Sequence, residues 1–291
     1  MIRTRLLVGS ILALAAGGVL IGDDYLLPGW FPVLFVCLAA LGVIASRELL
    51  NLFPESSRPS QPLVIAGVLL CLAANWYPKA QAKFDLPAAS SWSVVAAVFA
   101  AVLIAAFLVE MRRFTGEPGR AVPRIAATVL AVGYLGVLPC FFAQIRFLHG
   151  PSALLLALVI FVPKGNDIAA FFTGTFLGRH KMTPLLSPKK TWQGFAGGMA
   201  GGVLVAVGVW AWQPAVFPHS AIEAIGFGLA VGLAGVFSDL AESLVKRDCQ
   251  TKDASKSIPG FGGLLDVVDS VLFAAPVAYL WFRLSRAGLP G

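Results

Sequence analysis

Acidic, basic, hydroxyl and glycine residues gather between Ser238 and Ser270, in a chain that is otherwise mostly apolar. Asp239 and Ser243 are four residues apart, so they share one face if this segment is helical. A carboxylate and a hydroxyl one turn apart suit a hard cation such as Mg²⁺, which binds oxygen ligands and is usually shared with substrate phosphates. Lys246 and Arg247 continue the same helix and could contact those phosphates. The alternative is a helix end with solvated charges and pairs four residues apart.

Asp266 and Asp269 form a second acidic pair, three residues apart at the start of an apolar block. The glycine-rich segment 259–263 precedes them. Glycines allow backbone N–H groups to approach a phosphate closely, and the N-terminus of the following helix favours anions. The two carboxylates could instead act only as partners of the helix dipole.

A third polar segment, Ser187-Pro188-Lys189-Lys190-Thr191, precedes another apolar block. Two lysines flanked by hydroxyls are typical of a phosphate-binding site. The alternative is that these lysines only mark the cytoplasmic side of the membrane.

Composition identifies the elements that must position these residues. The chain has 291 residues, of which 58% are hydrophobic and only 13% charged, whereas soluble domains carry about a quarter charged residues. A membrane-spanning helix needs about 20 mostly apolar residues. We therefore predict an all-α, polytopic membrane bundle of eight to nine helices, the first of them a retained span and not a signal peptide. The spans are expected near 5–21, 30–46, 62–77, 93–109, 125–146, 152–178, 194–212, 224–241 and 264–282.

The sixth span is expected to be broken. Pro163 removes a helix hydrogen bond and Gly165 loosens the backbone. Lys164 and Asp167 then lie within the membrane. They indicate a polar cavity, or alternatively a pair that only balances its own charge.

Basic residues give the orientation. With the N-terminus in the cytoplasm, 16 of the 22 Lys and Arg residues fall on the cytoplasmic side, as the positive-inside rule requires. The segments 179–193 and 242–263 are then both cytoplasmic, where nucleotides are. Residues 1–150 are expected to form a transmembrane scaffold and 151–291 the catalytic region. The net charge of +7 favours anionic lipid or phosphate.

Several other classes of protein are disfavoured. The four cysteines are scattered without a CxxC pair, so neither zinc nor disulfides are expected. The chain has no GxxxxGK[ST], HExxH or GxSxG motif. The DGxxARx₈GxxxDxxxD pattern of the CDP-alcohol phosphotransferases is also absent.

The polar segments together resemble the phosphatidate cytidylyltransferase (CDP-diacylglycerol synthase) family. Its signature is S-x-[apolar]-K-R-x₄-K-D followed by P-G-H-G-G-[apolar]-x-D-R-x-D. Here it reads Ser243-Leu244-Val245-Lys246-Arg247, four residues, Lys252-Asp253, and then the segment 259–269. The segment 187–194 is similar to the family's second hallmark, and Asn166-Asp167 with Gly174 and 178–181 to a third. The resemblance covers about residues 160–280, but Phe261 and Val267 replace the family's His and Arg.

The resemblance implies that CTP and phosphatidate react to give CDP-diacylglycerol and diphosphate. It implies Mg²⁺, with a second metal or a monovalent cation such as K⁺ also possible. The short chain, without a long hydrophilic N-terminal extension, suits a bacterial inner membrane, and the basic residues place the site on the cytoplasmic side. A homodimer is possible and no nucleic-acid partner is expected. The alternatives are a related enzyme with another lipid acceptor, a transporter, or a catalytically impaired homologue. The implied metal ligands are Asp239, Ser243 and Asp266; the implied catalytic residues are Asp239, Asp266, Lys246 and Arg247; and the implied substrate contacts are Ser187, Lys189, Lys190, Thr191, Asp167, Lys252, Asp253 and Asp269.

Overall fold

The computed structural model describes residues 29–116, 118–255, 257–258 and 262–285, together with 9, 14–15, 17–23 and 25. Of the expected first span, 5–21, most residues lie outside this described part, and 17–21 are helical.

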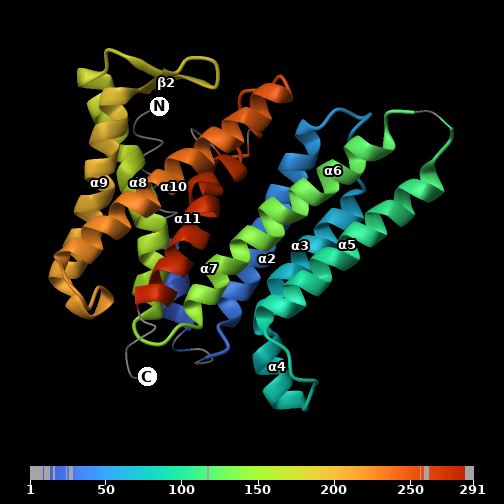
Figure 1. Cartoon of the computed structure of the whole chain (residues 1–291), viewed down its shortest axis with the longest axis horizontal. Coiled ribbons are helices and arrows are strands. Elements are labelled where there is room, and N and C mark those ends of the chain that lie inside the picture. The colour runs from blue at the N-terminus through green and yellow to red at the C-terminus, as the bar shows by residue number, and fades with distance from the viewer. Residues whose placement is uncertain are drawn as a thin grey trace. The chain divides into compact units, whose positions relative to one another are not determined.

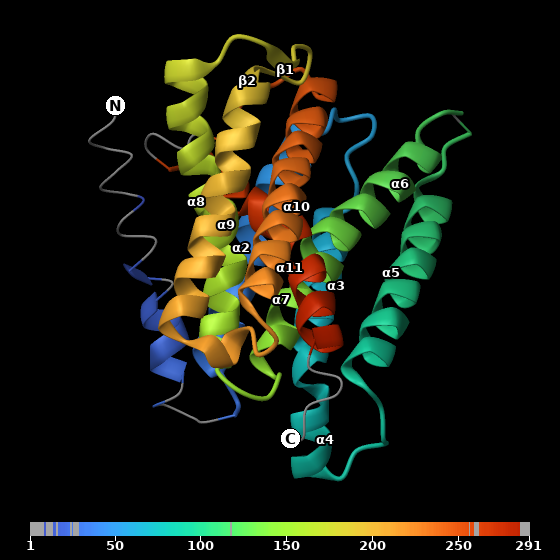
Figure 2. The same cartoon turned by 60° about the vertical axis from the view of Figure 1, so that its left-hand side comes forward.

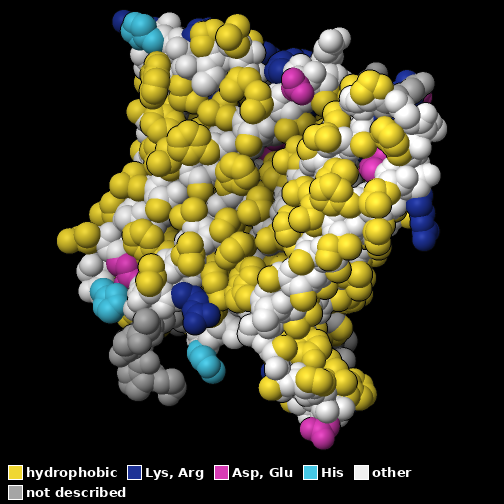
Figure 3. Space-filling model, turned by 45° about the vertical axis from the view of Figure 1, so that its right-hand side comes forward, with side chains coloured by type: hydrophobic (Ala, Val, Ile, Leu, Met, Phe, Trp, Pro, Cys, Tyr) yellow, Lys and Arg dark blue, Asp and Glu magenta, His cyan; other side chains and the backbone are white. Residues whose placement is uncertain are grey.

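Eight helical segments of the described chain are long and apolar enough to cross a membrane, with mean hydropathies from 1.5 to 2.7. They match the second to ninth expected spans, so the prediction of an all-α polytopic membrane protein is confirmed. Hydrophobic side chains cover most of the face shown in Figure 3. The segments are Pro32–Leu52, Gln61–Phe84, Ser91–Arg113, Ala121–Arg146, Ser152–Leu177, Trp192–Trp212, Ala221–Asp248 and Leu265–Ser285.

Two of these segments change their helical form along their length (Figure 1). The first contains α3 (Gln61–Ala73), the 3₁₀ turn η1 (Ala74–Trp76) and α4 (Tyr77–Phe84). The second contains α6 (Ala121–Val132), the π-helical turn η2 (Gly133–Val137) and α7 (Leu138–Arg146). The other six segments are α2 (Pro32–Leu52), α5 (Ser91–Arg113), α8 (Ser152–Leu177), α9 (Trp192–Trp212), α10 (Ala221–Asp248) and α11 (Leu265–Ser285), with the short 3₁₀ turn η3 (Pro214–Val216) before α10.

Local sequence explains where several helices begin. The hydroxyl groups of Ser90, Thr191 and Ser220 accept hydrogen bonds from backbone N–H groups in the first turns of α5, α9 and α10. Such side chains satisfy N–H groups that have no partner within the helix. At α2, the buried Asp23 carboxylate has the same role at longer range, because it accepts from the N–H groups of Val33 and Leu34, each at 2.7 Å.

The contacts divide the chain into two compact units. The first contains residues 1–144 and 253–267, and the second contains 145–252 and 268–291. The first division is close to the expected one at 150. However, the segment 253–267, which precedes and begins α11, belongs with the N-terminal helices.

The second unit is built on close contact among α8, α9 and α10 (Figures 1 and 2). Glycines allow this approach: a Cβ atom at Gly201 would lie 2.8 Å from the Gly165 carbonyl oxygen, and one at Gly228 would lie 2.7 Å from the Cα of Val203. Small residues at helix contacts are the usual means of packing helices in a membrane.

A β-hairpin joins α8 to α9 at one end of this three-helix group (Figure 2). Strand β1 (Lys181–Thr183) pairs antiparallel with β2 (Ser187–Thr191), with Lys181 opposite Thr191 and Thr183 opposite Ser187. The hairpin contains the lysine-rich segment, so the helix contacts fix where these lysines lie.

The expected break in the sixth span is wrong. Helix α8 continues through Pro163, from Ser152 to Leu177. Proline removes one N–H donor, and helices in a membrane tolerate this loss where neighbouring helices pack against them. Helix α10 packs closely on this turn of α8: a Cβ atom at Gly235 would lie 2.9 Å from the Pro163 Cβ.

Candidate active site

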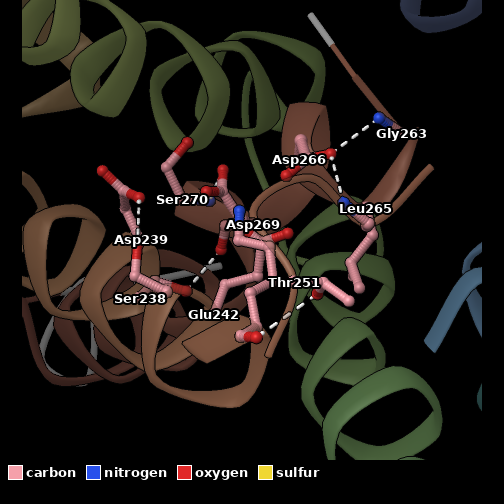
Figure 4. Close-up of polar contacts among 12 residues, drawn as sticks. Ser238, Asp239, Glu242, Thr251, Gly263, Leu265, Asp266, Asp269 and Ser270 are labelled. Carbon is pink, nitrogen blue, oxygen red and sulfur yellow. Dashed lines mark hydrogen bonds and ion pairs between the residues drawn. The ribbon is translucent and has the colours of Figure 1, made fainter. Parts of the chain in front are cut away.

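Three carboxylates meet in the second unit. Asp239 and Glu242 come from α10, and Asp269 comes from α11 (Figure 4). One oxygen atom of each lies within 4.8 Å of one oxygen atom of the others. Glu242 and Asp269 are buried, whereas the Asp239 side chain is 30% exposed. The cluster is therefore reached from the side of Asp239.

Each of the three carboxylates lies within 4.0 Å of a lysine ammonium group. The Lys190 ammonium lies 2.6 Å from Asp239 and that of Lys246 lies 2.5 Å from Glu242. The Lys164 ammonium lies 4.0 Å from Asp269 and 3.7 Å from Asp167. The three lysines thereby offset most of the negative charge of Asp239, Glu242, Asp269 and Asp167, which lowers the cost of holding several carboxylates together in an apolar protein.

Asp269 is fixed from two directions. One of its carboxylate oxygens accepts a hydrogen bond of 2.5 Å from the N–H of Ser270. Its backbone carbonyl accepts from the hydroxyl of Ser238 on α10 (Figure 4). The same hydroxyl oxygen accepts from the N–H of Phe273 at 3.3 Å. Ser238 thus ties α10 to α11 at the level of the cluster. On α10 the Ser243 hydroxyl donates to Asp239 over 3.5 Å.

The hairpin residues have two roles: Lys190 contacts the carboxylate cluster, and Thr191 stabilises the start of α9. In β2, Lys190 contacts Asp239, Lys189 is exposed and Ser187 is half-buried. The buried Thr191 caps α9 by accepting from the N–H of Gly194 at 3.1 Å. Arg247 donates to the Leu186 carbonyl oxygen over 3.4 Å, so this arginine also holds the hairpin turn.

Asp266 has its contacts in the first unit. One carboxylate oxygen accepts from the N–H groups of Gly263 at 2.6 Å and Ala254 at 3.1 Å (Figure 4). Asp253 lies in the same segment and is exposed, as is its neighbour Lys252. The roles of Asp266 as metal ligand and of Asp253 and Lys252 as substrate contacts stay predictions.

The structure thus brings together, within one unit, Asp239, Asp269, Asp167, Lys190, Lys246 and Ser243, all of which the sequence indicated. Of the two departures from the family signature, Val267 lies in the first turn of α11, and Phe261 lies outside the described residues.

Sequence reasoning missed three residues of the two units. Glu242 received no role, although its position four residues before Lys246 is a signal for an ion pair. Lys164 was paired with Asp167 only, and its contact with Asp269 depends on the packing of α11 against α8. Glu48 on α2 was overlooked entirely; its carboxylate accepts from the Ser255 hydroxyl at 2.6 Å and from the Leu265 N–H at 2.8 Å.

The cluster fits a divalent cation. It offers three carboxylates within reach of one another, and hard cations such as Mg²⁺ prefer oxygen ligands. The lysine ammonium groups beside these carboxylates occupy the positions of positive charge in the cluster. Asp239, Glu242 and Asp269 are therefore the residues that would hold a metal ion.

Comparison with known proteins identifies the family of the chain. The cytidylyltransferase family model matches residues 3–285. "Phosphatidate cytidylyltransferase 5, chloroplastic" of Arabidopsis thaliana is 32% identical over 205 residues, which is 62% of this chain and 50% of that protein. The phosphatidate cytidylyltransferase of Synechocystis sp. is 33% identical over 187 residues, 55% of this chain and 62% of that protein.

A protein of Escherichia coli named "Uncharacterized protein YnbB" is 37% identical over 132 residues, 45% of this chain and 43% of that protein. The matched regions thus span 43% to 62% of the length of these relatives. The family model matches nearly the whole chain, which therefore belongs to the cytidylyltransferase family.

Proposed function

We propose that this protein is a membrane-embedded phosphatidate cytidylyltransferase, which makes CDP-diacylglycerol and diphosphate from CTP and phosphatidate. The observation on which this depends is the group of three carboxylates and three lysines in the second unit. Two substrates with several negative charges must meet there. The main tasks of such a site are positioning and charge neutralisation.

In the reaction, a phosphate oxygen of phosphatidate attacks the α-phosphorus of CTP. The bond between the α-phosphorus and its bridging oxygen to the β-phosphate breaks, and diphosphate leaves. Phosphatidate already carries a negative charge near neutral pH, so no strong general base is needed. Lys190, Lys246 and Lys164 lie where they can turn toward phosphate oxygens and neutralise the charge on both substrates.

A metal ion is part of the proposal. Asp239, Glu242 and Asp269 would hold Mg²⁺, with Ser243 supporting Asp239 and Asp266 retained as a further predicted ligand. The ion would supply positive charge to phosphate oxygens. A second metal ion, or a monovalent cation such as K⁺, stays a prediction, as does a homodimer.

We place the site on the cytoplasmic side of a bacterial inner membrane. If every described span crosses the membrane, the hairpin at 178–191 and the segment 249–264 lie on the same side. These segments are rich in lysine and arginine, which supports a cytoplasmic position. CTP is present on that side.

The transporter alternative rested on a broken span with charges at its centre. Helix α8 is continuous, so the observation that favoured transport is gone. A different lipid acceptor, or impaired activity owing to Phe261 and Val267, would show in the assay below.

The test is an assay of the purified protein in detergent with labelled CTP, phosphatidate and Mg²⁺. We expect CDP-diacylglycerol and diphosphate in equal amounts, and no product when phosphatidate is omitted or EDTA is added. Absence of lipid product with phosphatidate across several divalent ions would refute the proposal. A CDP-lipid formed only with another phosphorylated lipid would identify the alternative acceptor.

A further inference from the structure

We propose that Glu48, in the N-terminal half of the chain, is a positioning residue for the segment that begins α11 and contains Asp253 and Asp266. The inference rests on the proposed function, which uses this segment. It concerns residues of the first unit only, since Glu48 and residues 253–267 both belong there. It assigns a role in the reaction to a helix that the sequence indicated as scaffold.

Glu48 holds the segment at two points. One of its carboxylate oxygens accepts from the Ser255 hydroxyl at 2.6 Å, and the other accepts from the Leu265 N–H at 2.8 Å. The Glu48 residue is only 6% exposed. A buried carboxylate in an apolar helix is costly unless it has hydrogen-bond partners, and both partners here come from this one segment.

The position of Leu265 gives the contact a second physical basis. Leu265 is the first residue of α11 and is buried. The first N–H groups of a helix have no partner within it, and negative charge near them is favoured by the helix dipole. Glu48 therefore acts as the cap of α11 from a distant part of the sequence and fixes where that helix starts.

The Glu48 contacts are interlocked with those of Asp266. Asp266 follows Leu265 directly and accepts from the N–H of Gly263 at 2.6 Å. Gly263 lies between the two carboxylates: a Cβ atom there would be 2.7 Å from a Glu48 oxygen. Displacement of Leu265 or Gly263 would therefore also move the Asp266 carboxylate. In enzymes a misplacement of 1 Å can cost about 100-fold in rate.

Three variants and one control test this role. Glu48→Ala removes both contacts. Glu48→Gln keeps the side-chain shape, since its amide oxygen can accept from Leu265 and its NH₂ group can donate to the Ser255 oxygen. Ser255→Ala removes one contact alone. Glu110→Ala is the matched control, because Glu110 is an equally buried carboxylate of the same unit that pairs with Arg113 and Arg124 instead.

Two measurements are needed on each variant. The first is kcat and KM for CDP-diacylglycerol formation. The second is hydrogen exchange of peptides covering 253–265, which does not depend on activity. For Glu48→Ala we expect kcat to fall about 10- to 100-fold, and exchange in 253–265 to accelerate. Glu48→Gln should retain most of the unmodified protein's kcat and most of its protection from exchange in 253–265. Ser255→Ala should have an intermediate effect that disappears in the Glu48→Ala background.

The outcomes separate the two proposals. If Glu48→Ala and Glu110→Ala change kcat and exchange equally, or if Glu48→Gln gives no recovery, the positioning role is refuted. If the unmodified protein makes no CDP-diacylglycerol while exchange accelerates only in Glu48→Ala, the proposed function fails and the anchoring of the segment stands. Should Glu48→Ala not fold, Glu48→Gln and Ser255→Ala give the same decision.

Discussion

The ammonium group of Lys190 lies 2.6 Å from the carboxylate of Asp239, which joins the β-hairpin to α10. Both side chains are partly exposed, at 25% and 30%, so the pair can open when a ligand enters. We therefore expect the Lys190–Asp239 pair to contribute to ligand binding and little to the stability of the fold, since ion pairs with access to water stabilise proteins little.

Replacing Lys190 tests this expectation. A hydrogen bond to a charged group is worth about 1.5–3 kcal/mol, so Lys190→Gln should raise the KM for CTP about 10- to 100-fold. The melting temperature should change little. Steady-state kinetics and thermal unfolding in detergent would measure both. Lys181→Gln, which removes an exposed lysine from the same hairpin, is the control; equal effects of the two variants would argue against a specific role for Lys190.

Binding of Mg²⁺ should depend on the carboxylate cluster. A ligand that binds only the folded state stabilises it by about 2.7 kcal/mol at 100 times its dissociation constant. We therefore expect Mg²⁺ to raise the melting temperature of the unmodified protein, and Asp239→Asn or Asp269→Asn to abolish that rise together with turnover. Glu223→Gln, at the other end of α10, should retain the rise in melting temperature that Mg²⁺ causes. An undiminished Mg²⁺ effect in both aspartate variants would disprove the assigned site.

The buried pair of Glu242 and Lys246 should behave differently from Lys190 and Asp239. Glu242→Leu leaves the Lys246 ammonium buried without its partner at 2.5 Å, and breaking such a pair costs about 3–5 kcal/mol. The double variant Glu242→Leu/Lys246→Met removes both charges and should regain most of the stability. It should stay inactive, because the proposed metal ligand and phosphate contact are both lost. Unfolding curves and the CDP-diacylglycerol assay on the same samples check this, and recovery of activity would contradict it.

Two glycines of α9 should respond in opposite ways to alanine. A Cβ atom at Gly201 would meet the Ala169 Cβ and lie 2.8 Å from the Gly165 carbonyl oxygen, whereas one at Gly208 would meet no described atom within 4 Å apart from the backbone of its own helix. Gly201→Ala is expected to cost about 1–3 kcal/mol through overpacking. Gly208→Ala should be neutral or stabilising by up to about 1 kcal/mol, since alanine favours helix. Thermal unfolding of the two variants measures this difference in stability. A Gly201→Ala protein as stable as Gly208→Ala would contradict the packing of α8 on α9.

Cys249 offers a test of orientation. It follows α10 directly, whereas Cys37, Cys71 and Cys140 lie within spans. A membrane-impermeant maleimide should label it in inside-out vesicles and not in right-side-out vesicles. Burial, and then the Asp248 carboxylate, raise the pKa of the Cys249 thiol. The thiolate is the reactive form, so the labelling rate should still be rising above the ordinary thiol pKa of about 8.5. Labelling in right-side-out vesicles would place the segment outside the cell.

The sequence alone determined the membrane-spanning helices and the residue types of the site. Hydropathy locates spans well because backbone groups in lipid must be satisfied within each helix. The spacing of Asp239 and Ser243, or of Lys164 and Asp167, also predicts neighbours, because residues three or four apart share a helix face.

Only the tertiary structure decided which distant groups meet. The contact of Lys190 with Asp239 and that of Lys164 with Asp269 each join two different elements. The continuity of α8 through Pro163 could not be decided from the sequence of α8, because a membrane helix that contains proline can be continuous or broken. Glu48 contacts Leu265 across 217 positions of sequence. Such contacts depend on how helices pack, and a local pattern of residues does not specify that packing.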